Sequence, residues 1–164
     1  MKLFSTPAFL AAGALALSWA TAAAVVVSLA TPIPHRAPIR AEANKLFDEL
    51  KTGFSGGRFG PYQVVDSDVR TRTLVIKRNA IDQQTWSKWA YCRVDPIDMI
   101  DSLRDGKVTL TLKLEPTTKT VTYAVVWAEF NGSYGIGTVN KNVQCTSTGV
   151  LEENILHQVG ATTP

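Results

Sequence analysis

The sequence VTLTLKLEPTTKTVTYAVVWAEF, residues 108–130, decides the fold. In 108–115, Val and Leu alternate with Thr, Lys and Glu, and this period of two predicts a strand with one buried face. After a turn at 115–119, residues 120–130 are apolar on both faces for most of their length. We therefore predict that 120–130 is the central strand of a sheet and that 108–115 is its antiparallel neighbour.

Residues after this hairpin continue the pattern of strands and turns. Asn131-Gly132 is a strong signal for a two-residue hairpin turn, so we expect 133–139 to pair on the other side of the central strand. A further turn, a short strand and a closing helix are predicted at 140–142, 143–146 and 150–159.

The segment before the hairpin predicts a helix and a second pair of strands. Residues 41–50 form an amphipathic pattern that Gly53 would end, and this helix either packs on the sheet or docks on a membrane surface. The glycine-rich loop at 54–61 lacks the flanking elements and lysine of a phosphate-binding loop. Residues 62–65 and 71–77 are rich in β-branched and aromatic side chains, with turn residues at 66–68 between them.

Two more helices are predicted between these strands and residue 108. The first starts at Asn79 and runs towards Ala90, although alternation at Trp89 and Tyr91 also allows a strand at its end. The second starts at Asp95-Pro96, an N-cap followed by proline at the first helical position, and is ended by Gly106. Together these elements predict one small α+β domain over 41–160, with a twisted antiparallel sheet of about four to six strands and helices packed on one face.

An apolar stretch precedes this domain. Residues 8–30 follow a short tail, 1–7, and contain no charged residue. At about 1.5 Å of rise per residue, a helix of this length covers the roughly 30 Å hydrocarbon core of a bilayer. We predict an N-terminal transmembrane anchor or a signal peptide that is removed, and both interpretations fit the residues. The proline-rich 31–40 predicts an extended stalk without regular hydrogen bonding, and 161–164 a flexible tail.

The net charge and the apolar stretch at residues 8–30, which we call the leader, together restrict the location of the protein and the partners it can have. The net charge is +3, from 17 basic and 14 acidic residues, which is not typical of a nucleic-acid-binding domain. We expect a single-pass membrane protein with its domain outside the cytoplasm, or a secreted or periplasmic protein after signal cleavage. The expected partners are the lipid bilayer, through 8–30, and another protein, with no nucleic acid.

The residues that could carry chemistry form no recognisable constellation. Cys92 and Cys145 are an even number in a chain with an export signal, so we predict a disulfide, with two free buried thiols as the alternative. The two histidines, His35 and His157, lie at no spacing that implies a catalytic dyad or a zinc motif. We therefore expect no catalytic residues, no metal and no cofactor.

A cluster of basic and aromatic residues is the candidate partner-binding surface. It could equally be a solvated edge whose charges discourage strand pairing between molecules. The candidate residues are Arg70, Arg72, Lys77, Arg78, Trp86 and Trp89. Our functional hypothesis is a non-catalytic interaction domain in an envelope-associated assembly. The alternative is a small-ligand-binding or inhibitory domain that uses a sheet lined by Tyr123, Val125, Trp127 and Tyr134, with a helix over it.

Overall fold

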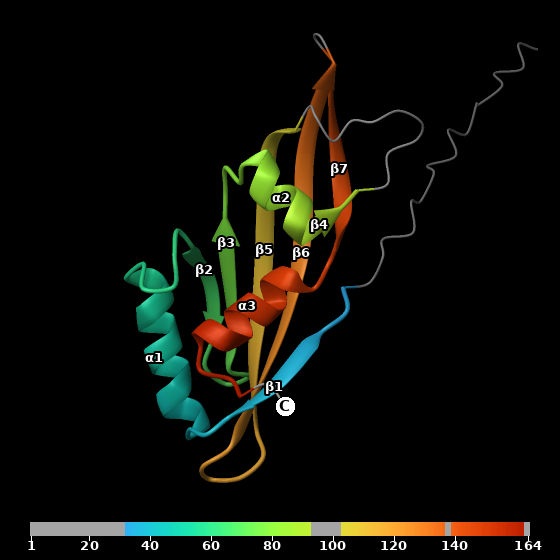
Figure 1. Cartoon of the computed structure of the whole chain (residues 1–164). Helices are drawn as coiled ribbons and strands as arrows, with labels where there is room; N and C mark the ends of the chain where they lie inside the picture. Colours follow the sequence, from blue (N-terminus) through green and yellow to red (C-terminus); the bar gives the residue numbers. More distant parts are fainter. Residues whose placement is uncertain (1–31, 93–102, 137–138, 163–164) are drawn as a thin grey trace, which may run out of the picture.

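A computed structural model describes residues 32–92, 103–136 and 139–162. Within these ranges seven strands form one antiparallel sheet and three helices lie on one of its faces (Figure 1). The predicted α+β class and the placement of the helices are confirmed, whereas the sheet has seven strands in the described ranges instead of the expected four to six. The apolar stretch at 8–30 lies outside the described residues, and none of the described helices is long and apolar enough to cross a membrane.

The sheet is built around the predicted pair of strands. Across it the strands follow the order β2 (Gln63–Asp68), β3 (Thr73–Arg78), β5 (Leu103–Pro116), β6 (Thr122–Ile136), β7 (Val139–Ser147) and β4 (Ala90–Tyr91). β1 (His35–Ile39) pairs with the lower half of β6, on the same side as β7 (Figure 1). The register of β5 and β6 sets Val108 opposite Phe130 and Leu112 opposite Val126.

The alternating pattern of β5 decides which face of the sheet is buried. Leu110 and Leu112 are 0% exposed beneath the helices, whereas Thr109 and Thr111 on the other face are half-buried. Val126 of β6 is also buried in the helix-covered core. A period of two in the sequence thus becomes one apolar and one mixed face of the sheet.

The predicted hairpin turn at Asn131-Gly132 is wrong, because both residues lie inside β6. Asn131 pairs with Lys107 on one side and with Gln144 on the other, so neighbours on both sides hold it in the sheet. Gly132 lies opposite Gly106 of β5, where an added Cβ would meet the Trp86 ring at 2.8 Å. Glycine in a strand suits such a close approach, and tertiary pairing outweighs the local turn preference.

This correction moves the strands that follow. The last register pair of β6 and β7 joins Ile136 to Val139, so β6 extends to Ile136. Residues 133–136 belong to β6, and the turn predicted at 140–142 is part of β7.

The helix predicted from Asp95 to Gly106 is wrong where the structure describes it. Residues 93–102 lie outside the described ranges, but Leu103 and Gly106 are part of β5. β5 continues past the predicted strand because β6 is long enough to pair with it as far as Tyr134.

The helices differ from their predicted bounds mainly at their ends. α1 (Ala43–Ser55) begins after Glu42, whose carboxyl oxygens accept hydrogen bonds from the backbone N–H groups of Asn44 and Lys45. Gly53 does not end it but lies inside, where an added Cβ would clash with the Phe59 ring. The glycine is needed for packing, and the helix ends at Gly56.

α2 (Gln83–Trp89) and α3 (Val150–Gln158) complete the helical layer. α2 starts at Gln83 rather than Asn79, because Asp82 provides the N-cap by accepting from the backbone N–H of Thr85. The strand allowed at its end is present as β4. The closing helix is confirmed as α3, and the hairpin of β2 and β3 is confirmed with its turn at 69–72 instead of 66–68.

The predicted stalk is wrong, because His35–Ile39 forms the edge strand β1. Pro38 lies opposite Tyr123, at an edge position where a missing N–H costs no sheet hydrogen bond. The outer carbonyl of Pro38 accepts from the backbone N–H of Thr162 at 3.1 Å. Ala161 is 9% exposed, so the start of the predicted flexible tail is packed against the domain, which itself begins before residue 41.

The helix-covered core joins all layers. Side chains from the helices meet the buried face of the sheet, including Phe47, Leu50 and Phe54 of α1, Trp86 of α2, and Leu151 and Ile155 of α3. Gly149, with φ of +87°, lets the chain turn from β7 into α3, and the ring of His35 lies where its Cβ would be. α3 is thereby held close to β1 and β6.

Candidate functional site

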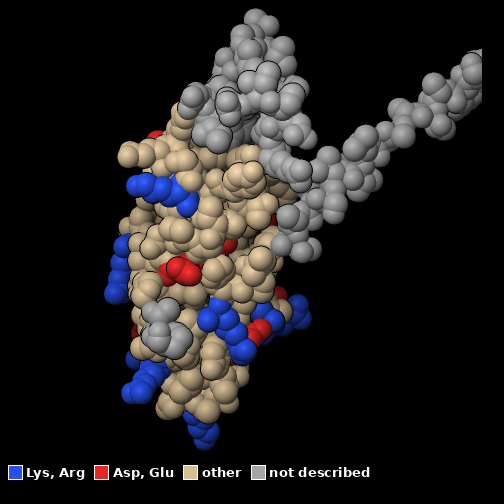
Figure 2. Space-filling view, turned by 45° about the vertical axis from the view of Figure 1, so that its right-hand side comes forward, with Lys and Arg blue, Asp and Glu red and all other residues tan. Residues whose placement is uncertain are grey.

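The structure separates the six candidate partner-binding residues. Arg70 and Arg72 lie around the turn between β2 and β3, and the Nε of Arg72 donates to Asn44 of α1 at 2.8 Å. Lys77 pairs with Thr109 on the sheet face that the helices leave uncovered. Figure 2 shows Lys and Arg atoms in several separate groups on the face in view, rather than in one patch.

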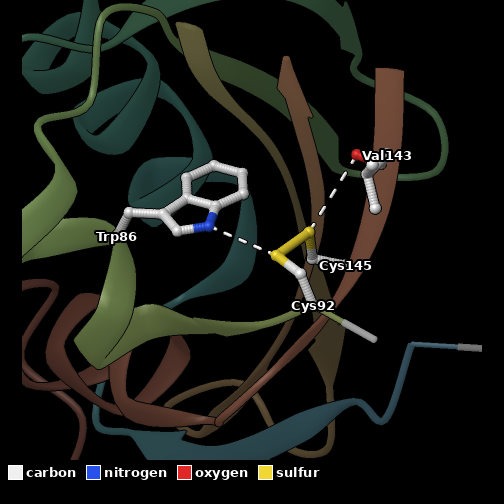
Figure 3. Close-up of a disulfide and its surroundings, with 4 residues drawn as sticks. All are labelled: Trp86, Cys92, Val143 and Cys145. Carbon is white, nitrogen blue, oxygen red and sulfur yellow. Dashed lines mark hydrogen bonds between the residues drawn. A yellow bond between two sulfur atoms is a disulfide. The ribbon is translucent and has the colours of Figure 1, made fainter. Parts of the chain in front are cut away.

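Trp86 has to be withdrawn from the candidate surface. It is 3% exposed, and its ring meets that of Phe130 edge-on at 5.4 Å between centroids. Its indole N–H donates to the Sγ of Cys92 at 3.3 Å (Figure 3). Trp86 is therefore a core residue that packs against the disulfide.

The predicted disulfide between Cys92 and Cys145 is present. It connects the end of β4 to β7, and the two Cα atoms are 4.4 Å apart. Figure 3 shows the bridge beside Trp86, with the carbonyl of Val143 near the sulfur of Cys145. Cys145 is 8% exposed, so the bridge closes one side of the core.

Arg78 and Trp89 do come together, in a hollow of about 370 Å³ on the helix-covered side. The end of β3 supplies Arg78, and the end of α2 supplies Trp89. The other walls are the loop 59–62 after α1 and five residues of α3, namely Leu151, Asn154, Ile155, His157 and Gln158. We call this the Arg78 hollow.

Arg78 lies between two aromatic rings of this hollow. The carbon of its guanidinium is 5.1 Å from the centroid of Trp89 and 5.9 Å from that of Tyr62. Both distances are within the range of a cation–π interaction. Burial raises the pKa of the Tyr62 hydroxyl above its ordinary value of 10.0, and a hydrogen bond with Arg78 opposes this rise. The cation is thus held by aromatic faces and a neutral hydroxyl.

No ion pair among the described residues involves Arg78. The structure has five ion pairs in those ranges, formed by His35, Arg36, Lys45, Lys107 and Lys113. Asp82 feels the charge of Arg78, but its carboxyl group is exposed and bound to Thr85. A half-buried guanidinium without a paired carboxylate is a group that can bind an anion.

The hollow has apolar walls and a polar rim. Leu151 and Ile155 are 1% exposed and lie beneath it, and Tyr62 packs edge-on against Phe54 at 6.0 Å. Asn154, His157 and Gln158 are exposed along its rim. Apolar walls with a few converging polar groups are typical of binding sites for small molecules or side chains.

Sequence analysis missed most of this site. Only Arg78 and Trp89 were singled out, because Phe59 and Tyr62 belong to a loop and the α3 residues are more than sixty positions away. The aromatic residues Phe59 and Tyr62, which flank Gly60-Pro61, were the available signal, since aromatic side chains in such a segment usually pack against another element.

The cap of α2 at Asp82 makes the stability of the fold depend on pH. Hydrogen bonds from the hydroxyl and backbone N–H of Thr85 lower the pKa of Asp82 from its ordinary 3.8. The cap therefore stabilises the fold above pH 3.8, and this contribution is lost as the pH falls through the lower folded-state pKa. Between about pH 6 and about pH 2, we expect the wild type to lose more stability than Asp82→Asn, which keeps an acceptor but does not titrate.

Urea unfolding at a series of pH values measures this difference. Asp48→Asn, which removes an exposed carboxyl of α1, is the control for the change in net charge. If Asp82→Asn and Asp48→Asn follow the same curve, the cap of α2 does not depend on the charge of Asp82.

A second, polar hollow of about 410 Å³ lies on the uncovered sheet face. It is lined by Asp105, Lys107, Asn131, Ser133, Asn142 and Gln144 among others. Lys107 and Asp105 form an ion pair at 2.6 Å, so part of its polarity is satisfied within the chain.

The uncovered face also carries the residues of the alternative ligand-binding hypothesis. Tyr123, Val125 and Trp127 lie there, whereas the hypothesis requires a helix over them. The three described helices cover the opposite face, and the guanidinium of Arg36 lies over Tyr123 at 4.0 Å. The side chain of Tyr134 lies outside what the structure describes.

These features define a small α+β domain with a disulfide and an aromatic hollow around an arginine. No family model and no curated protein matches the sequence. Among solved structures, the chain is similar to a DUF4468 family protein from Bacteroides ovatus, with a TM-score of 0.35 and 10% sequence identity. The match covers 68% of this chain and 59% of the length of that protein, and at this similarity it supports no inference about function.

Proposed function

We propose that the chain is an exported or membrane-anchored interaction domain, which acts as an accessory component of an envelope-associated assembly such as a secretion, conjugation or virion machine. The Arg78 hollow carries the proposal, because its cation has no ion-pair partner in the described ranges and its walls are apolar. The partner's contact residues occupy this hollow.

The leader and the disulfide support the location. Residues 8–30 are long and apolar enough to serve as a transmembrane anchor or as a signal peptide. The bridge between Cys92 and Cys145 is compatible with an oxidising, extracytoplasmic compartment. The domain thus acts outside the cytoplasm, either held at the membrane or released into the periplasm.

Site-specific photo-crosslinking in intact cells tests the proposal. A photoreactive residue replaces Gln158, on the rim of the hollow, and a matched variant carries it at Lys119, in the exposed turn between β5 and β6. We expect a light-dependent adduct of discrete mass from position 158 and none from 119. Equal labelling from both positions, or none from 158, would contradict a partner in the hollow.

A small-ligand-binding domain is the second candidate. The size of the Arg78 hollow favours it, since about 370 Å³ is in the range of pockets for small ligands. Under this alternative the protein binds a compound instead of a partner's side chains, and crosslinking at 158 yields no protein adduct.

A further inference from the structure

The geometry of Arg78 indicates which chemical group the hollow accepts. The guanidinium carbon of Arg78 lies over the rings of Trp89 and Tyr62, within cation–π distance of both. A guanidinium carries its N–H donors in one plane, and no carboxylate among the described residues forms an ion pair with Arg78. These donors form a fork that matches two oxygens in one plane.

The walls exclude a strongly charged or fully polar ligand. Leu151 and Ile155 are 1% exposed and already covered, so the accessible apolar side chains of the hollow are those of Phe59, Pro61 and Trp89. The part of a ligand that covers these side chains loses contact with water. Burying such a surface is favourable for an apolar group and unfavourable for a charged one. The ligand therefore has an anionic end at Arg78 and an apolar body against Phe59, Pro61 and Trp89.

We propose that the Arg78 hollow binds a carboxylate attached to an apolar group. This inference rests on the proposed function and specifies what the partner presents. A carboxylate has two coplanar oxygens and one negative charge, which a single guanidinium can satisfy in a bidentate pair. A phosphate carries about two charges at neutral pH, and one arginine between apolar walls leaves part of that charge unpaired.

Two sources can supply this chemistry. One is the free C-terminus of a partner polypeptide with an apolar last residue. The other is a small aromatic or aliphatic acid. Both place the carboxylate on Arg78 and the apolar body against Phe59, Pro61 and Trp89. They differ in the contacts made along the rim by Asn154.

Titration of the isotope-labelled full chain, followed by two-dimensional amide and indole NMR, tests the chemistry. The small-acid probes are phenylacetate, its neutral amide and phenyl phosphate. The peptide probes are an acetylated tetrapeptide ending in Phe, as the free acid and as the C-terminal amide. We expect the acids to shift the indole signal of Trp89 and to bind at least about tenfold more tightly than their amides.

The peptide arm distinguishes the two sources. Tighter binding by the peptide acid than by phenylacetate, together with shifts at Asn154, identifies a polypeptide terminus. Tighter binding by phenylacetate identifies a small acid. Equal binding of acids and amides overturns the inference, and so does tighter binding by phenyl phosphate than by phenylacetate.

Two substitutions at Arg78 provide a second readout. Arg78→Gln should weaken binding of the acid by at least about tenfold and leave binding of the amide unchanged. Arg78→Lys keeps the charge but not the planar fork. Its affinity for the acid should therefore fall between that of the wild type and that of Arg78→Gln. Arg70→Gln, in the turn between β2 and β3, is the matched control and should bind as the wild type does. Wild-type affinity in Arg78→Gln overturns the proposal.

Crosslinking separates this inference from the function on which it rests. Loss of the adduct at position 158 in Arg78→Gln supports both. An adduct that persists in Arg78→Gln keeps the interaction domain and overturns carboxylate recognition. Acid-selective binding in solution without an adduct in cells keeps the chemistry and contradicts the proposed assembly.

Discussion

Removal of the disulfide by Cys92→Ala together with Cys145→Ala is expected to lower the free energy of unfolding by about 4 kcal/mol. The bridge joins residues 53 positions apart, and loop-closure entropy for a loop of this length gives a stabilisation of this size. The thermal midpoint should fall by on the order of 10 °C, since the domain exceeds 100 residues. Urea unfolding of oxidised protein and variant measures the difference.

The reduced wild type separates the cross-link from side-chain packing. Reduction removes the bond but keeps both sulfurs, so the reduced protein should match the double variant within about 1 kcal/mol. A larger gap would mean that packing of Trp86 against Cys92 contributes independently. Equal stability of oxidised and reduced protein would contradict a stabilising bridge. The intact mass of the unreduced protein also reports whether the bridge has formed and whether the leader has been removed.

The parts of the fold that could be predicted from the sequence are those in which pattern and burial agree. Alternation in β5 placed Leu110 and Leu112 on the buried face, and the apolar residues on both faces of 120–130 identified β6 as its partner. α3 followed from the spacing of its apolar residues, such as Leu151 and Ile155. In these elements the periodicity is set by the surface that becomes buried, so local sequence is sufficient.

Prediction failed where distant segments override a local preference. Asn131-Gly132 favours a turn, yet β5 and β7 supply hydrogen-bond partners on both sides and keep it extended. Prolines in 31–40 argued against a strand, yet an edge position facing away from β6 tolerates Pro38. Neither outcome is visible without knowing which strands are neighbours.

The candidate site shows the same limit. Trp86 and Trp89 are three residues apart in α2, and both were candidate partner-binding residues. In the structure Trp86 fills the core beside Cys92, whereas Trp89 lies half-buried at the hollow with Arg78. A helical period identifies a stripe but not what covers each end of it, which here depends on the loop 59–62 and on α3.

Glu152 occupies a break in the sheet that no sequence pattern indicated. On one side of β6, pairing with β1 ends at Val126 and pairing with β7 begins at Phe130. Between them, the backbone N–H of Ala128 donates to Oε1 of Glu152 at 3.1 Å. Oε2 accepts from the hydroxyl of Ser147 at 2.8 Å, and the side chain of Glu152 is 0% exposed. A carboxyl group thus replaces a neighbouring strand at this point.

Glu152→Ala should therefore lower the free energy of unfolding by about 3 kcal/mol. The substitution leaves a buried backbone N–H and a hydroxyl without their acceptor, and it opens a cavity beneath α3. Glu152→Gln keeps one acceptor oxygen but presents an amide donor to the other partner, so we expect an intermediate loss of about 1.5 kcal/mol. Urea unfolding at neutral pH measures both.

Glu153→Ala is the matched control for this prediction. Its side chain is 62% exposed, and its contact with His35 is 3.9 Å, so the change should be within about 0.5 kcal/mol. Combining Glu152→Ala with Ser147→Ala should cost less than the sum of the single changes, because both remove the same hydrogen bond. Additive losses, or a loss for Glu152→Ala no greater than for Glu153→Ala, would contradict this prediction. Either result would show that the carboxyl group of Glu152 does not stabilise β6 in the gap between β1 and β7.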